Sequence, residues 1–205
     1  MKININYQNS IQINDNIYID PYKLEKITPA KYIFITHSHY DHLSITDISK
    51  ILTNNTILIA PKDCINQLLE LSINKDNIIE VEPNKEYKIN DITFKTVPAY
   101  NLNKSFHPKT NNWVGYIINI DNESNYIIDD SDYIEEMNNI KCDNLFIPIG
   151  GVYTMNIDEA IEAIKVINPK VVYPTHYGPI IENSERNGII LQERLKEKYN
   201  VKLFL

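Results

Sequence analysis

The chain has 205 residues, a net charge of −7 and an isoelectric point near 5.2. An acidic chain of this kind is a poor partner for nucleic acid, whose phosphates attract basic surfaces, so a small-molecule partner is expected. No stretch approaches the roughly 20 apolar residues that span a bilayer, and the first residues lack the apolar segment of a secretory signal, which predicts a cytoplasmic protein.

Short strands are predicted through the first third of the chain, because Ile or Tyr alternates there with polar residues. These alternating segments are Lys2–Asn6, Ser10–Asn14 and Asn16–Asp20. Tyr32–Thr36 is instead a continuous apolar run, which is typical of a buried strand. It leads directly into the sequence HSHYDH.

Strands and helices alternate after this point. Helices are predicted at Ser44–Leu52, Pro61–Leu71, Ile157–Ile167 and Glu185–Tyr199. Strands are predicted at Thr56–Ala60, Ile78–Glu82, Glu86–Asn90, Ile92–Val97, Trp113–Ile120, Tyr126–Asp129, Leu145–Ile149, Lys170–Pro174 and Val201–Leu205, with a turn at Asp121–Ser124. Asn156 and Glu159 can form a capping box at the start of the third helix. We expect a single domain, residues 1–205, of the α+β class, with two sheets and helices outside them.

Three of the five histidines, His37, His39 and His42, lie within six residues directly after a buried strand. Side chains two residues apart in an extended segment point the same way, so His37 and His39 can bind one cation. Asp41 and His42, just past the bend, can face a second cation about 3.5–4 Å away, the spacing of two-metal hydrolases. Without metal, such a cluster would be costly to desolvate. The motif therefore predicts a metal site.

In these residues the sequence resembles the metallo-β-lactamase superfamily, and especially its small branch of metal-dependent hydrolases similar to sugar-acid lactonases. The resemblance covers nearly the whole chain and implies an αββα sandwich, two mixed sheets packed face to face with helices on the outer faces. It implies that metal is bound by His37, His39, Asp41 and His42 in THSHYDHLS, by Asp130 in YIIDDSD and by His176 in YPTHYGP. It also implies supporting positions beside the site for Asp20 in IYIDPY and for Gly150 and Gly151 in PIGGVYTM.

Two departures from that family leave parts of the site open. Where the family usually has Gly-Asp-Thr, this chain has Asp129-Asp130-Ser131, so either aspartate can bridge two metals, and we favour Asp130. Where the family often supplies a histidine, this chain has Asn101, whose amide oxygen is a weaker zinc ligand than imidazole. Either the first metal site is then weak, or a single metal binds at the stronger set Asp41, His42, Asp130 and His176. His107 is the candidate to replace the missing histidine. Residues 101–112 are polar and contain proline, which predicts a surface loop.

The expected chemistry is hydrolysis of an ester-like bond by a metal-bound hydroxide, since a bound metal lowers the pKa of water from about 15.7 towards 7. The resemblance to the family implies that Asp41 holds this hydroxide and moves its proton. Tyr40, as a hydrogen-bond donor to an oxyanion, and His107 are the other catalytic candidates. One or two divalent ions are expected, Zn²⁺ first, with Mn²⁺, Ni²⁺ or Fe as alternatives.

A small-molecule ester or lactone, with or without a phosphate group, fits the acidic chain best among the possible substrates. The alternatives are a phosphodiesterase or nuclease on the same fold, and a metal-binding sensor module without catalysis. The sequence does not indicate an oligomeric state.

Overall fold

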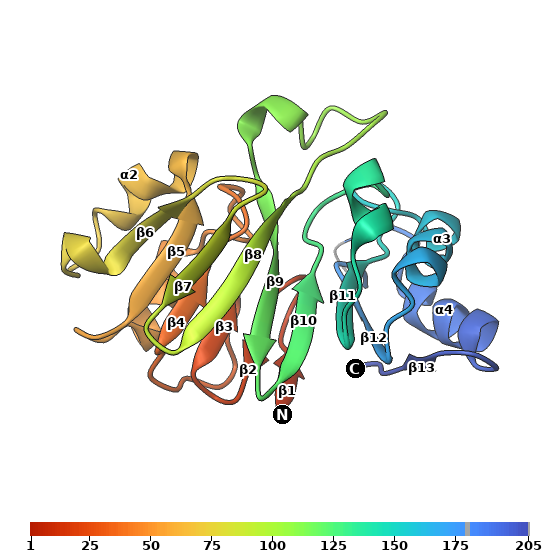
Figure 1. Ribbon diagram of the computed structural model, residues 1–205, viewed down its shortest axis with the longest axis horizontal. Helices are drawn as coiled ribbons and strands as arrows, with labels where there is room; N and C mark the ends of the chain where they lie inside the picture. The colour runs from red at the N-terminus through yellow and green to blue at the C-terminus, as the bar shows by residue number, and fades with distance from the viewer. Residues whose placement is uncertain (179–180, 205) are drawn as a thin grey trace. The chain divides into compact units, whose positions relative to one another are not determined.

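The computed structural model describes residues 1–178 and 181–204, which form two compact units, Met1–Glu82 and Pro83–Leu205. Each unit is built on one mixed β-sheet with helices of its own (Figure 1). The two mixed sheets with associated helices confirm the predicted α+β class. The prediction of a single domain stays a prediction.

Residues 1–82, all of them described, contain a six-stranded sheet whose strands follow one another in sequence order. The first three strands pair antiparallel, and the third to the sixth pair in parallel. They are β1 (Ile3–Ile5), β2 (Ile11–Ile13), β3 (Ile17–Ile19), β4 (Tyr32–Phe34), β5 (Ile57–Pro61) and β6 (Ile78–Val81). Because β3 and β4 are parallel neighbours, the segments that follow them leave the sheet side by side.

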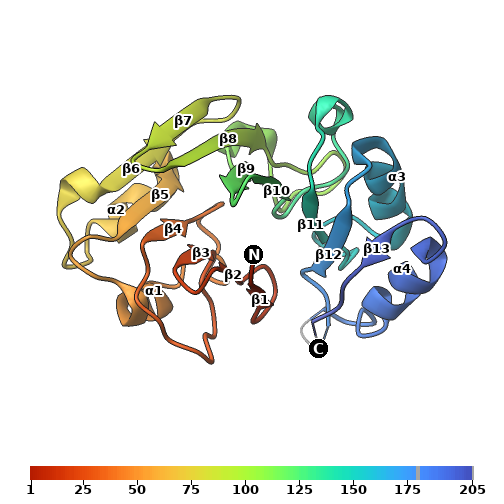
Figure 2. The same cartoon turned by 60° about the horizontal axis from the view of Figure 1, so that its bottom comes forward.

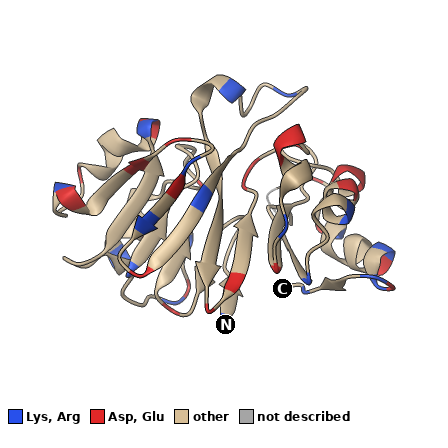
Figure 3. Ribbon diagram, viewed as in Figure 1, with Lys and Arg blue, Asp and Glu red and all other residues tan. Residues whose placement is uncertain are grey.

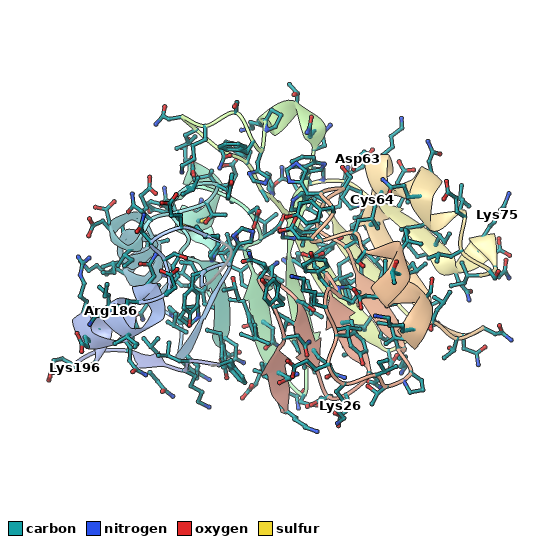
Figure 4. The ribbon with its side chains drawn as sticks, turned by 180° about the vertical axis from the view of Figure 1, so that it is seen from behind. Lys26, Asp63, Cys64, Lys75, Arg186 and Lys196 are labelled. Atoms are coloured by element: carbon teal, nitrogen blue, oxygen red, sulfur yellow. The ribbon has the colours of Figure 1, made fainter. Side chains whose placement is uncertain are left out.

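The helices of the first unit differ from their predictions in one place. The helix α1 (Ile45–Ile51) begins as expected, with Ser44 as its N-cap. Of the helix predicted over Pro61–Leu71, residues 62–68 are helical, whereas Pro61 ends β5, where it pairs with Val81. The chain continues as the 3-10 turn η1 (Lys62–Cys64), the short α2 (Ile65–Leu68) and the 3-10 turn η2 (Lys75–Asn77). Figure 4 labels Asp63 and Cys64 in η1.

Burial rather than helix propensity holds α2 in place. A single helical turn is marginal by itself in water. Cys64, Leu68 and Leu71 are buried in an apolar core with residues of β4 and α1, such as Ile33 and Ile48. The same core also holds the end of β4 in place, from which the segment His37–His42 continues.

Within the described residues, the second unit contains a seven-stranded sheet in the spatial order β13-β12-β11-β10-β9-β8-β7. Strands β7 to β10 pair antiparallel, and β10 to β13 pair in parallel. They are β7 (Glu86–Ile89), β8 (Ile92–Pro98), β9 (Val114–Ile120), β10 (Glu123–Ile127), β11 (Asn144–Pro148), β12 (Val171–Thr175) and β13 (Asn200–Val201). The last strand was predicted over Val201–Leu205, of which Leu205 lies outside the described residues.

The turn between β9 and β10 is tighter than predicted. It consists of Asp121 and Asn122, with φ angles of 52° and 64°. Two positive φ angles in a two-residue turn are typical of type I′, whose twist matches that of the paired strands. The four-residue turn over Asp121–Ser124 is therefore wrong, and β10 begins at Glu123 rather than Tyr126.

The helix α3 (Ile157–Ile167) has its predicted bounds and its predicted capping box. Asn156 Oδ1 accepts a hydrogen bond from the Glu159 N–H at 3.0 Å, and the Glu159 carboxylate accepts one from the Asn156 N–H at 2.8 Å. The helix α4 (Asn187–Leu195), between Arg186 and Lys196 in Figure 4, is shorter than predicted. Figures 1 and 2 show α3 and α4 side by side near β12 and β13.

The second unit also contains the 3-10 turns η3 (Lys109–Asn111) and η4 (Glu135–Asn139), which were not predicted. Both basic and acidic residues occur along α3 and α4 (Figure 3). None of the helices in residues 1–178 and 181–204 has the length and apolar character needed to cross a membrane.

Candidate metal centre

The segment after β4 turns sharply and gathers its histidine rings. The backbone N–H groups of His42 and Leu43 both donate to the His39 carbonyl, at 3.0 and 2.8 Å. The centroid of the His37 ring is 4.6 Å from that of His39 and 4.0 Å from that of His42. His37 Nε2 lies 3.0 Å from His39 Nδ1, so two ring nitrogens converge on one point. This is the arrangement that the two-residue spacing predicts.

Asp20, directly after β3, supports these rings from a fully buried position. Its Oδ2 lies 2.8 Å from His42 Nδ1 and accepts from the Thr36 hydroxyl at 2.6 Å. The Thr36 N–H donates to Oδ1 at 2.9 Å, and Asn9 Nδ2 donates to Oδ2 at 3.1 Å. A carboxylate that accepts from Nδ1–H leaves Nε2 of His42 as the atom for a metal. Asp20 therefore has the supporting geometry that the resemblance implies.

Asp41 and Tyr40 are the more exposed side chains of the same segment. Asp41 Oδ2 lies 3.7 Å from His42 Nε2, and its side chain is 13% exposed. Tyr40 is 71% exposed, and its ring lies edge-on to Tyr22 with the centroids 6.1 Å apart. Asp41 thus lies beside His42 Nε2, whereas Tyr40 is exposed to solvent.

The second unit brings Asp130, His107 and His176 together. Asp130 Oδ2 lies 3.1 Å from His176 Nε2 and 3.3 Å from His107 Nε2. All three side chains are almost completely buried. His107, which the sequence left open between ligand and loop residue, therefore lies at the same carboxylate oxygen as the predicted ligand His176.

The loop between β8 and β9 is exposed over most of residues 101–112, as its polarity predicts, but not at Asn101 and His107. Asn101 and His107 are buried, at 7% and 2% exposure, whereas Leu102 and Phe106 are 58% and 45% exposed. The prediction is wrong for the two polar residues because they bond to each other. The Asn101 N–H donates to the His107 carbonyl at 2.8 Å, and the His107 N–H donates to Asn101 Oδ1 at 3.1 Å.

Sequence reasoning missed Asp132 and Lys104, which form a salt bridge next to this loop. The Asp132 carboxylate accepts from Asn101 Nδ2 at 3.1 Å and from the Leu102 N–H at 2.8 Å. No spacing rule connects Asp132 to a loop that precedes it by 31 residues. The available signal was the aspartate itself, two residues after the predicted bridging ligand Asp130.

Several site residues have a left-handed backbone conformation. The φ angles are 45° at Asp20, 71° at Asp129 and 50° at His176, each shortly after a strand with a parallel neighbour. Such a conformation costs a non-glycine residue on the order of 1 kcal/mol, less for aspartate, and is concentrated at functional sites. The conformation at Asp129 explains why the resembled family usually has glycine there.

The glycines after β11 lie beside His176. A β-carbon at Gly150 would be 2.5 Å from the His176 carbonyl oxygen and 2.6 Å from Ile181 Cδ1. Gly151 has a φ of 88°, which other residues rarely adopt. Glycine is therefore required for the close approach of this loop to the His176 backbone. In the motif YPTHYGP, Pro179 lies outside the described residues.

An ion pair joins η3 and η4 on the surface of the second unit. Lys109 Nζ lies 3.1 Å from Glu136 Oε1 and 3.0 Å from the Tyr100 hydroxyl. Hydrogen bonding to Tyr100 and then to Glu136 raises the pKa of Lys109 above its ordinary value. The lysine therefore stays charged at neutral pH and helps to fix the loop that carries His107.

Comparisons with known proteins agree with this geometry. Residues 11–177 match the family model of the β-lactamase superfamily domain. The chain is 34% identical over 185 residues to a metal-dependent hydrolase of Nanoarchaeum equitans, covering 84% of this chain and 81% of the relative. It is 30% identical over 184 residues to one of Thermoplasma volcanium, covering 82% and 79%. A solved structure from Parabacteroides distasonis, described as a metal-dependent hydrolase, matches with a TM-score of 0.82 and 26% identity over 98% of this chain and 91% of that one.

The fold and the imidazole and carboxylate donors define a metallo-β-lactamase-fold protein with two mixed sheets. The chain belongs to the β-lactamase superfamily and is one of its metal-dependent hydrolases. The family resemblance and the fold class predicted from the sequence are confirmed. The likeness to sugar-acid lactonases stays a prediction.

Proposed function

We propose that this hydrolase cleaves an ester-like bond in a small molecule, a carboxylic ester or a lactone with or without a phosphate group. We propose further that the donors of the two units serve one centre of one or two divalent ions, with Zn²⁺ before Mn²⁺, Ni²⁺ or Fe. Membership of a family of metal-dependent hydrolases supports the shared centre.

The observation that carries the proposal is the pair of contacts at Asp130. One buried carboxylate oxygen faces the Nε2 atoms of His107 and His176 at 3.3 and 3.1 Å. His107 Nδ1 lies 3.0 Å from Asn101 Oδ1, so the ring turns its other nitrogen, Nε2, towards the carboxylate. Imidazole nitrogens and a carboxylate oxygen gathered in this way are donors that Zn²⁺ prefers.

The proposed donors are His37, His39, Asp41 and His42 from the first unit and His107, Asp130 and His176 from the second. An ion bound by such groups lowers the pKa of water towards about 7 and polarises the bond to be cleaved. Asp41 accepts the proton of the attacking water and returns it to the leaving group. Asp20 keeps the His42 ring in place during this transfer, and Tyr40 donates a hydrogen bond to a substrate oxygen.

The charge distribution supports a small substrate over a polyanion. The chain carries a net charge of −7. On α3 and α4 the basic residues Lys165 and Arg194 stand among acidic residues (Figure 3). Nucleic-acid-binding surfaces, by contrast, cluster their basic residues.

The test is elemental analysis of the purified chain together with substrate turnover. We expect one or two metal ions per chain, a loss of at least half of them in Asp130→Ala, and no change in Asp158→Ala, whose side chain is 80% exposed on α3. Asp41→Asn should retain at least one ion and lower kcat for an ester or lactone by about 10²–10⁴-fold.

Each other outcome has a defined meaning. A chain that binds no metal after reconstitution, or an Asp130→Ala variant that keeps its full metal content, contradicts the proposed centre. Turnover of phosphodiesters alone favours a phosphodiesterase. A metal-loaded chain that turns over neither class of substrate is a binding module.

A further inference from the structure

We infer that Asn101 is a positioning residue that fixes the tautomer of His107, so that His107 presents a lone pair on Nε2 towards Asp130. The inference rests on the proposed function only in taking His107 as a metal donor. Asn101 is then not a remnant of a lost ligand but the residue that keeps an imidazole usable at this site.

Two backbone groups decide which way the Asn101 amide is oriented. The His107 N–H lies 3.1 Å from one side-chain atom, which must be the oxygen because a backbone N–H can only donate. The Tyr153 carbonyl oxygen lies 3.0 Å from the other, which must be the nitrogen because a carbonyl can only accept. A flipped amide would place donor against donor and acceptor against acceptor.

The amide orientation in turn decides the tautomer. His107 Nδ1 lies 3.0 Å from the same Asn101 oxygen, which only accepts, so Nδ1 carries a hydrogen. A neutral imidazole has one N–H, and Nε2 is left as the acceptor. Nε2 is also the nitrogen that lies 3.3 Å from Asp130 Oδ2. The nitrogen available for a metal is therefore the one that faces the predicted bridging carboxylate.

Asp132 and Lys104 hold the Asn101 amide in this orientation. Asp132 Oδ1 accepts from Asn101 Nδ2 at 3.1 Å and is paired with Lys104, which also donates to the Thr154 carbonyl at 3.0 Å. The Asp132 side chain is 4% exposed, so the charge-assisted bond is shielded from water. Both donor and both acceptor positions of the amide are thus occupied, and rotating it would break all four bonds.

The test reads the tautomer directly, by long-range ¹H–¹⁵N correlation of the imidazole rings in metal-free protein. We expect His107 to be protonated at Nδ1 in the native chain. Asn101→Leu removes the acceptor and should shift the hydrogen partly or wholly to Nε2. Asn103→Leu, at an exposed asparagine of the same loop, is the matched control and should leave the tautomer unchanged.

Metal affinity is the second readout, measured by competition between the protein and a chelator for Zn²⁺ and by the absorption spectrum of the Co²⁺ form. Loss of a residue that orients a histidine ligand costs about 10–100-fold in affinity, and we expect this range for Asn101→Leu. Asn101→Asp keeps an oxygen acceptor for Nδ1–H, so it should retain the native tautomer even if the loop is destabilised. This variant keeps the test decisive if Asn101→Leu does not fold.

Two results would overturn the inference: a native His107 with a hydrogen on Nε2 and none on Nδ1, or an Asn101→Leu variant whose tautomer and Zn²⁺ affinity match those of Asn103→Leu. The tautomer is read without metal, so it is independent of the proposed function. A native chain that binds none of Zn²⁺, Mn²⁺, Ni²⁺ and Fe would contradict the proposed function and leave the tautomer result standing.

Discussion

Asp129 and Asp130 are adjacent in the chain, but Asp129 differs in its backbone conformation and Asp130 in its side-chain contacts. Asp130 holds its carboxylate against two imidazole nitrogens, whereas Asp129 has a φ of 71°. Glycine adopts this conformation without steric cost, and an aspartate does so at some cost. The backbone at position 129 therefore favours glycine, whereas the side chain at position 130 lies against the imidazoles of His107 and His176.

Replacing Asp129 by glycine tests this division of roles. We expect Asp129→Gly to keep its full metal content and to unfold with a free energy equal to the native one or up to about 1 kcal/mol higher, since backbone strain is relieved. Elemental analysis and urea denaturation measure the two quantities. If Asp129→Gly loses its metal while Asp130→Ala keeps it, Asp129 is the bridging residue.

The histidine motif could be predicted from the sequence because its members lie within six residues after one buried strand. Their geometry is then fixed locally, by spacing and by one turn. The place of His107 could not be predicted in the same way. It depends on hydrogen bonds across the loop from Asn101, and Asn101 depends on Asp132, 31 residues further along. Local polarity alone predicted a surface loop.

Among the helices and strands, predictions were accurate where the local sequence favoured a single structure. The capping box of Asn156 and Glu159 located α3 correctly. Pro61 was misread because proline suits both the first turn of a helix and the end of a strand, and its pairing with Val81 decided between them. Such pairing is a tertiary contact, which local sequence patterns do not contain.

Asp143 connects three neighbouring strands at the point where β11 begins. Its carboxylate accepts from the N–H of Ser124 in β10 at 2.8 Å and lies 2.7 Å from Nζ of Lys170, which directly precedes β12. The Lys170 hydrogen bond and then the Ser124 N–H lower the pKa of Asp143 from 3.8 to about 2. Ionised Asp143 therefore stabilises the parallel part of the sheet, from which Asp130 and His176 emerge.

Replacing Asp143 by asparagine should remove the contribution of Asp143 to the pH dependence of the free energy of unfolding. The folded pKa of Asp143 lies below its unfolded value, so its stabilisation is fully present above about pH 4 and is lost as the pH falls towards about 2. We expect Asp143→Asn to lower the free energy of unfolding by about 1 kcal/mol at pH 7, and by less at pH 3, in urea denaturation.

The matched control for this substitution is Asp158→Asn. Its side chain is 80% exposed and lies 2.7 Å from Arg194 Nη1, and an exposed pair of this kind contributes about 0–1 kcal/mol. A difference between the native chain and Asp143→Asn that stays constant from pH 7 to pH 3 would contradict the assigned role of Asp143.

At the scale of the whole molecule, each unit has the parts of an independently stable structure. Each has its own sheet, and each packs helices on it through an apolar core of its own. The proposed centre takes donors from both units. An ion that binds donors of both units stabilises only the state in which both are folded, so it should couple their unfolding.

Calorimetry with and without metal tests this coupling and the prediction of a single domain. At a free Zn²⁺ concentration of about 100 times Kd, binding raises the free energy of unfolding by about 2.7 kcal/mol. In a chain of this length, each kcal/mol raises Tm by about 2–4 °C. We therefore expect Zn²⁺ to raise Tm by about 5–10 °C and to give one cooperative transition. In Asp130→Ala most of this increase should vanish, because the second unit loses its central donor. If Asp130→Ala keeps the whole increase, the first unit binds the ion alone, and the shared centre is wrong.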